Sequence, residues 1–331
     1  MLSKLNLLPH CANIQLARPH WVLISLAVLA LACIVMFMTL GVQGNWGFVL
    51  EFRGRKLLGL LLVAYAIAIS TVLFQTVTNN RILTPSIMGF DSLYILIQTA
   101  IMFFLGTSVF ALMNAHLRFG IEVLLMVGFS GLLFRWLFIK AEHSLHLLVL
   151  IGLVCGVFFR SLANFIQRML DPNSFQVLQD SLFASFSSID SSLLGISWVL
   201  VGLISLALWR LGHCFDVLTL GRSHAIGLGV NYQRRVVVIL INVSILVAIS
   251  TALVGPITFF GLLVASLAHG LIGTSKHRYI LPAAVLLAVI CLVGGQTLLE
   301  RVFSFNTALA IIIEFLGGLV FIFLIIKGAA K

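Results

Sequence analysis

The chain has 331 residues, of which 61% are hydrophobic and 9% are charged, and its formal net charge at pH 7 is +10. Soluble domains carry about 25% charged residues, so this composition excludes an ordinary soluble protein. The basic residues are dispersed between apolar runs, which excludes the clustered basic face of a nucleic-acid-binding protein. No nucleic-acid partner is expected.

Apolar runs of about 20 residues, the length that crosses a bilayer as a helix, recur along the chain. Strands of alternating polarity do not recur, so helices are favoured over a barrel. We predict an all-α polytopic membrane protein with about ten transmembrane helices, forming a single transmembrane domain over 1–331. The predicted spans are 21–41, 57–76, 91–110, 119–139, 145–167, 192–211, 235–255, 258–274, 279–298 and 307–327.

Two features of the chain fix the expected topology. Residues 236–275 contain no Asp, Glu, Lys or Arg and are too many for one crossing, so a reversal is predicted at Gly255-Pro256, followed by a short eighth span. Most of the 20 Lys and Arg residues fall on one side if the N-terminus is cytoplasmic. The positive-inside rule then predicts an N-in, C-in protein, with its first apolar run retained as a span.

A polar segment, residues 210–235, separates the sixth and seventh predicted spans. Gly221, Gly227 and Gly229 divide it into two short helical pieces, which are too polar for lipid. The topology places this segment in the cytoplasm. We predict a small helix-turn-helix at the membrane surface that contacts a soluble partner.

Motifs for covalent chemistry are missing from the sequence. There is no G-x-x-x-x-G-K-[ST] phosphate loop, H-E-x-x-H or G-x-S-x-G. Five scattered cysteines, without C-x-x-C spacing, predict neither a zinc site nor a disulfide framework; they are Cys11, Cys33, Cys155, Cys214 and Cys291. No catalytic residue, metal or cofactor is expected on this chain.

Polar side chains within the spans are the candidates for a transport path. Arg160, Asn164 and Gln167 share one helical face, which either lines a cavity or reaches water at the helix end. Glu122 and Glu314 are the only acids expected in or near a span interior, and they leave open a proton-coupled mechanism. The histidines are mostly at loop positions, where solvated or interfacial roles are expected; these are His116, His143, His146, His213, His224, His269 and His277.

Three segments resemble the FecCD/BtuC-like permease subunits of the ABC importers for ferric siderophores, haem and cobalamin. Gln75, followed by Asn80 and residues 85–89, is similar to the family's L-Q-x-x-x-x-N-P-L-A-x-P-x-x-L-G. Residues 220–230 match L-G-x-x-x-A-x-x-L-G-V, and residues 255–262 match G-P-I-x-F-x-G-L. The resemblance covers essentially the whole chain and implies a BtuC-like permease fold.

The chain also departs from this family pattern. The departures are Arg81 and Leu83 in the first motif, Ala265, Ser266 and His269 after the third, and Gln296 before the last loop. They indicate a divergent branch, one of two unlike permeases that pair as a heterodimer.

The resemblance implies a role for the polar segment. In the family, the matching residues form coupling helices that sit in a groove of a cytoplasmic ATPase dimer, which binds ATP and Mg²⁺. We therefore call residues 210–235 the coupling segment. Its implied contact residues are Leu220, Gly221, Arg222, Ala225, Leu228, Gly229 and Val230.

Outer and central roles follow from the same resemblance. Arg53, Lys56 and Arg301 match basic residues that dock a periplasmic siderophore-binding protein through ion pairs. Asn80 aligns near the family's cytoplasmic gate. The candidates for the path and gate are Gln75, Asn80, Arg160, Asn164 and Gln167.

The expected function is that of a permease subunit in a bacterial ATP-driven importer, which moves a ferric siderophore across the inner membrane. A haem or cobalamin importer of the same family is one alternative. An ion-coupled secondary transporter without an ATPase is a second, and an intramembrane enzyme is a third. The missing nucleophile–base pairs disfavour the enzyme.

Overall fold

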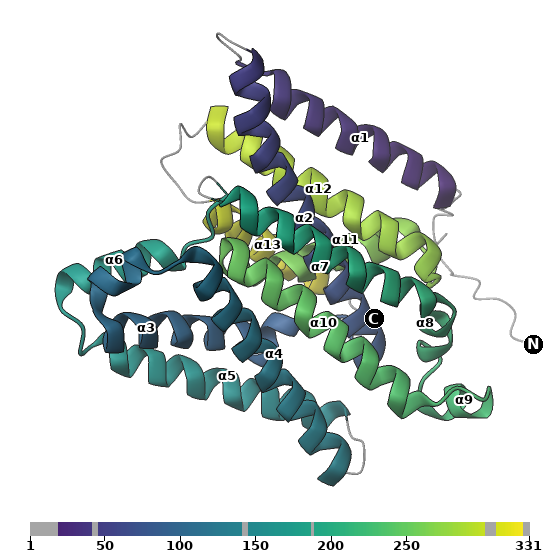
Figure 1. Ribbon diagram of the computed structural model, residues 1–331. Helices are drawn as coiled ribbons and strands as arrows, with labels where there is room; N and C mark the ends of the chain where they lie inside the picture. Colours follow the sequence, from purple (N-terminus) through teal and green to yellow (C-terminus); the bar gives the residue numbers. More distant parts are fainter. Residues whose placement is uncertain (1–18, 42–45, 141–144, 187–188, 302–308, 327–331) are drawn as a thin grey trace, which may run out of the picture.

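The structure is a computed structural model (Figure 1). It describes residues 19–41, 46–140, 145–186, 189–301 and 309–326. Every regular element in these ranges is a helix, which confirms the all-α fold class. The helices are α1 (Pro19–Thr39), α2 (Trp46–Thr78), the short 3₁₀ helix η1 (Pro85–Met88), α3 (Phe90–Leu112), α4 (Ala115–Lys140), α5 (Leu145–Gln167), α6 (Pro172–Leu182), α7 (Ser191–Arg210), α8 (Gly212–Leu218), α9 (Arg222–Gly227), α10 (Tyr232–Val254), α11 (Phe260–Ile272), α12 (His277–Arg301) and α13 (Leu309–Ile326).

Eight helices in the described ranges are long and apolar enough to cross a membrane, and the chain is therefore a multi-pass membrane protein. They are α1, α2, α3, α4, α5, α7, α10 and α12. The two other predicted spans fall on α11, which has only 13 residues, and on α13. The short apolar helix expected after Gly255-Pro256 is thus present. The total of ten crossings and the N-in, C-in orientation stay predictions.

Helix α2 begins at Trp46, earlier than the predicted start at residue 57. The charges of Glu51, Arg53 and Arg55 suggested a loop there. Arg55 instead pairs with Glu51 one turn earlier, at 2.8 Å, and the Arg53 guanidinium donates to backbone carbonyls at the end of α1. The polar turns at this end are therefore stable as a helix.

Helix α2 lies at the centre of the bundle and packs against α1, α7, α10, α11 and α12. Its apolar stretch is 72% buried, whereas those of α1 and α5 are only 17% buried. The small side chains of Ala64, Ala66 and Ala68 are fully buried and allow neighbouring helices to approach closely. The outer faces of α1 and α5 carry exposed apolar side chains such as Val28 and Phe158, which suit lipid or another membrane subunit.

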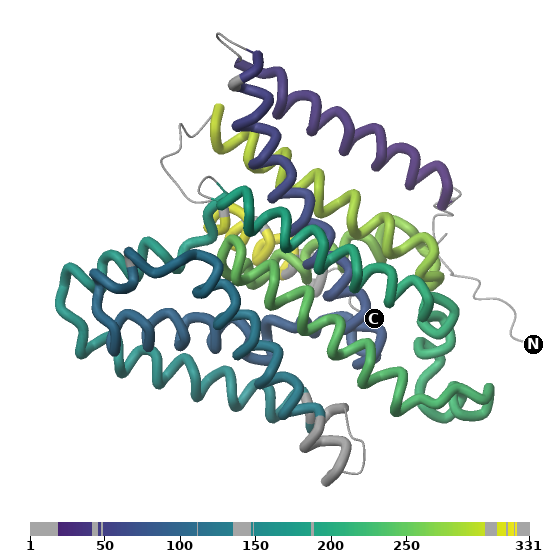
Figure 2. Tube along the Cα trace, in the orientation of Figure 1, coloured from purple at the N-terminus to yellow at the C-terminus, as the bar shows by residue number. Residues whose placement is uncertain are grey.

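The two ends of the bundle carry different short helices. Helices α8 and α9 lie together at one end, and α6 lies at the opposite end (Figures 1 and 2). Asp171 caps α6 by accepting hydrogen bonds from the backbone N–H groups of Asn173 and Ser174. The coupling segment and the α6 end are thus separated by the length of the bundle.

Candidate functional site

The coupling segment folds as two short helices with a turn between them. Gly221 and Gly229 have φ angles of +88° and +80°, which side chains with a Cβ rarely adopt. Gly221 separates α8 from α9, and Gly229 follows the end of α9. The predicted glycine-punctuated helix-turn-helix is confirmed.

One face of the coupling segment packs inward and the other is open. Phe215, Leu218 and Ala225 are buried, with exposed fractions of 3% or less. Leu220, Ile226 and Leu228 expose 56%, 53% and 62% of their surfaces, and Arg222 is also exposed. We call these three apolar residues the tip of the segment. Exposed apolar side chains gathered on a polar segment are typical of a contact surface for another protein.

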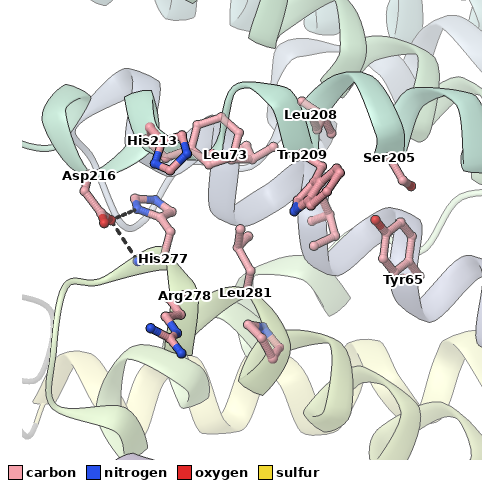
Figure 3. A pocket seen from close by; sticks show the side chains of 14 residues that line it. Tyr65, Leu73, Ser205, Leu208, Trp209, His213, Asp216, His277, Arg278 and Leu281 are labelled. Atoms are coloured by element: carbon pink, nitrogen blue, oxygen red, sulfur yellow. Dashed lines mark hydrogen bonds and ion pairs between the residues drawn. The ribbon is translucent and has the colours of Figure 1, made fainter.

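A chain of polar contacts connects helix α8 to the core, and Figure 3 shows its first part, between Asp216 and His277. The Asp216 carboxylate accepts from the backbone N–H of His277 at 2.9 Å and lies 2.8 Å from His277 Nδ1. On the other side of the ring, Nε2 lies 2.7 Å from the hydroxyl of Thr76, in α2. We call Asp216, His277 and Thr76 the α8–α2 joint. It links three helices through one buried imidazole.

The protonation of the joint follows from its partners. A carboxylate only accepts, so Nδ1 of His277 carries a proton and donates it to Asp216. Partial burial raises the pKa of Asp216, but the hydrogen bonds from His277 and the charges of His277 and Lys276 outweigh this effect and leave the pKa below its usual value. The carboxylate therefore stays ionised at neutral pH, and the stability it contributes is lost only as the pH falls through the lowered pKa.

A crevice of about 710 Å³ borders the joint. It lies between α2, α7, α8 and α12, and Figure 3 shows Tyr65 and Trp209 at one end and the Asp216–His277 pair at the other. Its lining is largely apolar. Because the crevice leaves a space between α8 and its neighbours, the contacts of Asp216 with His277 connect α8 to the core at this point.

The turn that follows α2 lies next to the joint in sequence. Gln75 precedes Thr76, and its side-chain amide donates to the carbonyl oxygen of Arg81 at 2.6 Å. The Asn80 side chain accepts from the N–H of Ile82 at 2.9 Å. We call residues 79–82 the gate turn. The structure brings Gln75 and Asn80 together here, where they hold the backbone of the turn.

The three candidate residues on α5 have different surroundings. Gln167 donates to the hydroxyl of Thr99 in α3 at 3.1 Å. Arg160 and Asn164 are exposed, on a helix that otherwise exposes mostly apolar side chains. Their exposure is compatible with both sequence interpretations, a shared path or a polar helix end, so their path role stays a prediction.

The candidate docking residues lie together where α1 ends and α12 ends. Arg53 Nη1 donates to the carbonyls of Phe37 and Leu40, each at 2.9 Å, and Arg301 also donates to Leu40 O. Cations at a helix C-terminus satisfy its free carbonyls. Arg301 is exposed and Arg53 is partly exposed, so both are within reach of a protein that approaches this end.

The expectation that Lys56 is available for docking needs a correction. Its side chain is only 5% exposed, and its Nζ lies 2.7 Å from Glu300 Oε1 in α12, which also accepts from Gln296. The charge that suggested a surface contact is neutralised inside the bundle. Arg55, the neighbouring basic residue, is the more exposed cation.

Two other expectations from the sequence are wrong. Asp91 is a third interior acid, with only 4% of its surface exposed, although its place at the predicted start of a span suggested a helix end. His277 is likewise buried rather than solvated. His116, His213 and His224 are exposed as expected, whereas the side chains of His143 and His146 lie outside the described residues.

The two acids considered for a proton path are held by different elements. Glu122 is buried and accepts from Gln98 at 2.6 Å, and Arg118 lies 3.3 Å from it. Glu314, in α13, accepts weakly from the backbone N–H of Thr258 at 3.5 Å. Each carboxylate therefore has its own partners.

The cysteines and potential metal ligands are dispersed in the described ranges. Cys33, Cys155, Cys214 and Cys291 are free and partly buried, and Cys11 lies outside those ranges. No three His, Cys, Asp or Glu side chains come together among the residues that the structure describes. The joint and the coupling segment therefore form the candidate site.

Comparison with known proteins gives consistent matches over most of the chain. Residues 21–327 match the FecCD transport family. The petrobactin import system permease protein YclO of Bacillus subtilis is 48% identical over 299 residues, which cover 90% of this chain and 95% of that protein. The petrobactin import system permease protein FatC of Bacillus anthracis is 35% identical, with 85% of this chain and 80% of that protein covered.

A solved structure confirms the permease fold. It is an inward-facing conformation of a metal-chelate type ABC transporter, with a TM-score of 0.80, 24% identity, and coverage of 93% of this chain and 99% of that chain. At this identity the likeness shows the fold alone. The fold is the BtuC-like arrangement predicted from the sequence.

The buried ion pair gives a test of the packing at the α1 end. Lys56→Met leaves the Glu300 carboxylate without its cation and should lower the free energy of unfolding by about 3 kcal/mol. The double variant Lys56→Met/Glu300→Gln should recover most of that loss. Thermal unfolding of the purified chain measures both changes.

The matched control is Arg55→Met, because its pair with Glu51 is exposed and should contribute less than about 1 kcal/mol. Equal losses for Lys56→Met and Arg55→Met would show that the Lys56–Glu300 pair is not buried.

Proposed function

Because the chain belongs to the FecCD transport family, we propose that this siderophore ABC importer permease carries ferric petrobactin across the bacterial inner membrane. The observation that supports this cargo is the 48% identity to a petrobactin import permease over 95% of that protein. Conversion of ATP energy is assigned to a separate ATPase. This chain binds no cofactor in the proposal and contributes the membrane path.

Contact with the ATPase is assigned to the coupling segment. Leu220, Ile226 and Leu228 present an apolar tip, and Arg222 beside them supplies positive charge. Burying such side chains in a groove removes apolar surface from water, and a few well-buried residues usually dominate an interface. Gly221, Ala225, Gly229 and Val230 shape the tip.

Movement of the coupling segment is transmitted to the gate turn through the α8–α2 joint. Asp216 belongs to α8, which packs against α9, and Thr76 lies beside Gln75, which holds the gate turn. A displacement of α8 by the ATPase therefore acts on α2 within a few residues of Asn80. The joint keeps α8 and α2 together, and two conformations that differ in the position of this unit against the other helices provide the differential contacts that coupling needs.

The remaining partners are assigned from exposed faces. A second, unlike permease covers α5, which is mostly exposed and carries Arg160 and Asn164, so that the path runs between the two subunits. Arg301 and Arg53 contact acidic residues of a periplasmic siderophore-binding protein at the opposite end from the coupling segment. Lipid covers α1.

Cargo choice is tested by uptake competition. Cells that depend on this permease, with its ATPase and binding protein, should take up ⁵⁵Fe-petrobactin, and excess unlabelled ferric petrobactin should abolish the signal. Cobalamin and haem should not compete. Competition by cobalamin or haem, with no effect of ferric petrobactin, would refute the cargo.

The apolar tip is tested by paired truncations. Ile226→Ala/Leu228→Ala should lower ATPase co-purification and siderophore uptake at least about tenfold, because each buried anchor contributes on the order of 1–2 kcal/mol. Leu203→Ala/Leu206→Ala is the control, since these side chains on α7 expose 62% and 54% of their surfaces, close to the values at the tip. If both pairs behave alike, the tip is not the ATPase contact.

The joint is tested by removing one hydroxyl. Thr76→Val should keep the ATPase bound and active but lower uptake per ATP hydrolysed about tenfold, because the ring of His277 loses its contact with α2. Thr78→Val is the matched control, since the Thr78 hydroxyl bonds only to carbonyls of its own helix. Normal coupling in Thr76→Val would contradict the proposed transmission.

A further inference from the structure

A small polar cavity lies inside the bundle, away from the coupling segment. It has a volume of about 20 Å³ and is bordered by α2, η1, α3, α10 and the loop between α10 and α11. Asp91 lines it together with seven Ser and Thr residues. A space of this size holds one water-sized particle.

Two buried oxygen atoms of the cavity lining have no hydrogen-bond partner. They are Oδ2 of Asp91 and Oγ1 of Thr84, on side chains that are 4% and 2% exposed. An unpaired polar atom in the interior costs free energy, and an unpaired carboxylate oxygen costs more than a neutral one. Both atoms border the same cavity, so one occupant can satisfy them together.

Two of the neighbouring hydroxyl groups are oriented to accept. Ser70 donates its proton to the carbonyl of Ile67 at 3.1 Å, and Ser250 donates to the carbonyl of Val247 at 3.0 Å. These two protons are committed to the helix backbone, so both side chains offer only oxygen lone pairs to the cavity. Such a lining favours a positively charged occupant over an anion.

The charges near the cavity also favour a positively charged occupant. Asp91 interacts electrostatically with Glu314 of α13 and with Arg160 of α5. Arg160 is exposed and Glu314 does not line the cavity, so the buried carboxylate of Asp91 is the charge that faces it. A monovalent cation restores neutrality at this depth, where an uncompensated charge is unfavourable.

The ligand set also selects the kind of cation. Transition metals favour His and Cys ligands, and no group of three His, Cys, Asp or Glu side chains occurs in the described ranges. Ca²⁺ requires six to eight oxygens, commonly with several carboxylates, whereas this cavity has one carboxylate in its lining. Hard neutral oxygens with a single carboxylate suit an alkali cation, and the small volume favours Na⁺ over K⁺.

We infer that Asp91 and Thr84, with the surrounding hydroxyl groups, bind one Na⁺ ion in this cavity. The ion connects α2 to the loop before η1 and to the break between α10 and α11. Interrupted helices supply ion sites in other transporters because their ends offer free oxygen atoms. The Na⁺ site shares no residue with the coupling segment or the joint, so it can be tested independently of the proposed cargo and coupling.

The backbone near the cavity is also closely packed. A Cβ at Gly261 would lie 2.2 Å from Thr71 Oγ1, so α11 touches α2 beside the cavity. An ion here therefore stabilises one arrangement of α2, α3 and α11. Because Na⁺ binds this folded arrangement, it should raise the unfolding temperature of the importer.

The experiment uses the complete purified importer in lipid nanodiscs, in choline chloride at constant ionic strength. Titration with ²²Na⁺ should show saturable binding, and saturating NaCl should raise the unfolding temperature by at least about 2 °C. Asp91→Asn in this chain should weaken the Na⁺ affinity of this site at least tenfold. Any equivalent site in the partner permease would be unaffected by that variant and can be subtracted.

Two further variants make the test specific. Thr84→Val keeps all charges and should still weaken Na⁺ binding, so it serves even if Asp91→Asn fails to assemble. Glu122→Gln is the matched control, because Glu122 is a buried carboxylate whose partners are Gln98 and Arg118, and it should leave Na⁺ binding unchanged.

Three results would overturn the inference. The first is equal stability in NaCl and choline chloride without saturable ²²Na⁺ binding, as expected if the cavity holds water. The second is wild-type Na⁺ affinity in both Asp91→Asn and Thr84→Val. The third is protection by K⁺ at concentrations as low as those of Na⁺, which would refute the assignment by size.

Discussion

The buried imidazole of His277 contacts both Asp216 and Thr76. The connection between the coupling segment and helix α2 depends on these two contacts. Helix α8 is short and borders a crevice on one side, while its Phe215 and Leu218 are buried on the other. The ring is buried, where polar contacts are stronger than in water and costly to leave unmade. In the proposed coupling, a displacement of α8 is therefore passed to α2 through His277 and Thr76.

Because α2 lies at the centre of the bundle, the contact between His277 and Thr76 connects α8 to a helix that touches many others. Helix α2 packs against α1, α7, α8, α10, α11 and α12 and is followed by the gate turn, where Gln75 and Asn80 hold the backbone. Small buried alanines make α2 a close-packed element, which moves with its neighbours rather than bending alone. The proposed Na⁺ cavity borders the same helix at Ser70 and Thr71. The joint at Thr76, the turn after Thr78 and the cavity at Ser70 and Thr71 are thus all connected to one helix.

The sequence predicted the features that depend on local pattern. Apolar runs gave the helices, Gly221 and Gly229 gave the turns of the coupling segment, and Gly255-Pro256 gave the short helix α11. The family resemblance was confirmed by the match over residues 21–327. Each of these features is determined by residues that are close together in the sequence, so composition and residue spacing are sufficient to predict it.

Contacts between distant segments could not be predicted in this way. Lys56 and Glu300 are 244 residues apart, and Thr76 and His277 are 201 residues apart, so nothing in either local sequence indicates the partner. Asp91 was missed because a polar residue at a predicted span boundary is normally solvated, whereas here residues of α2, η1 and α10 and the loop after α10 surround its cavity. Buried polar residues at helix ends are therefore the positions where local pattern is least informative.

Pulsed electron paramagnetic resonance on the assembled importer tests the mechanical link most directly. Spin labels at Ser223, on α9, and Asn79, in the gate turn, report the distance between the coupling segment and the gate; both positions are exposed. A rigid joint predicts one narrow distance distribution that persists with and without ATP, while a label pair from Asn79 to Asp180 on α6 changes. A Ser223–Asn79 distance that changes with ATP while the joint is intact would contradict transmission through His277.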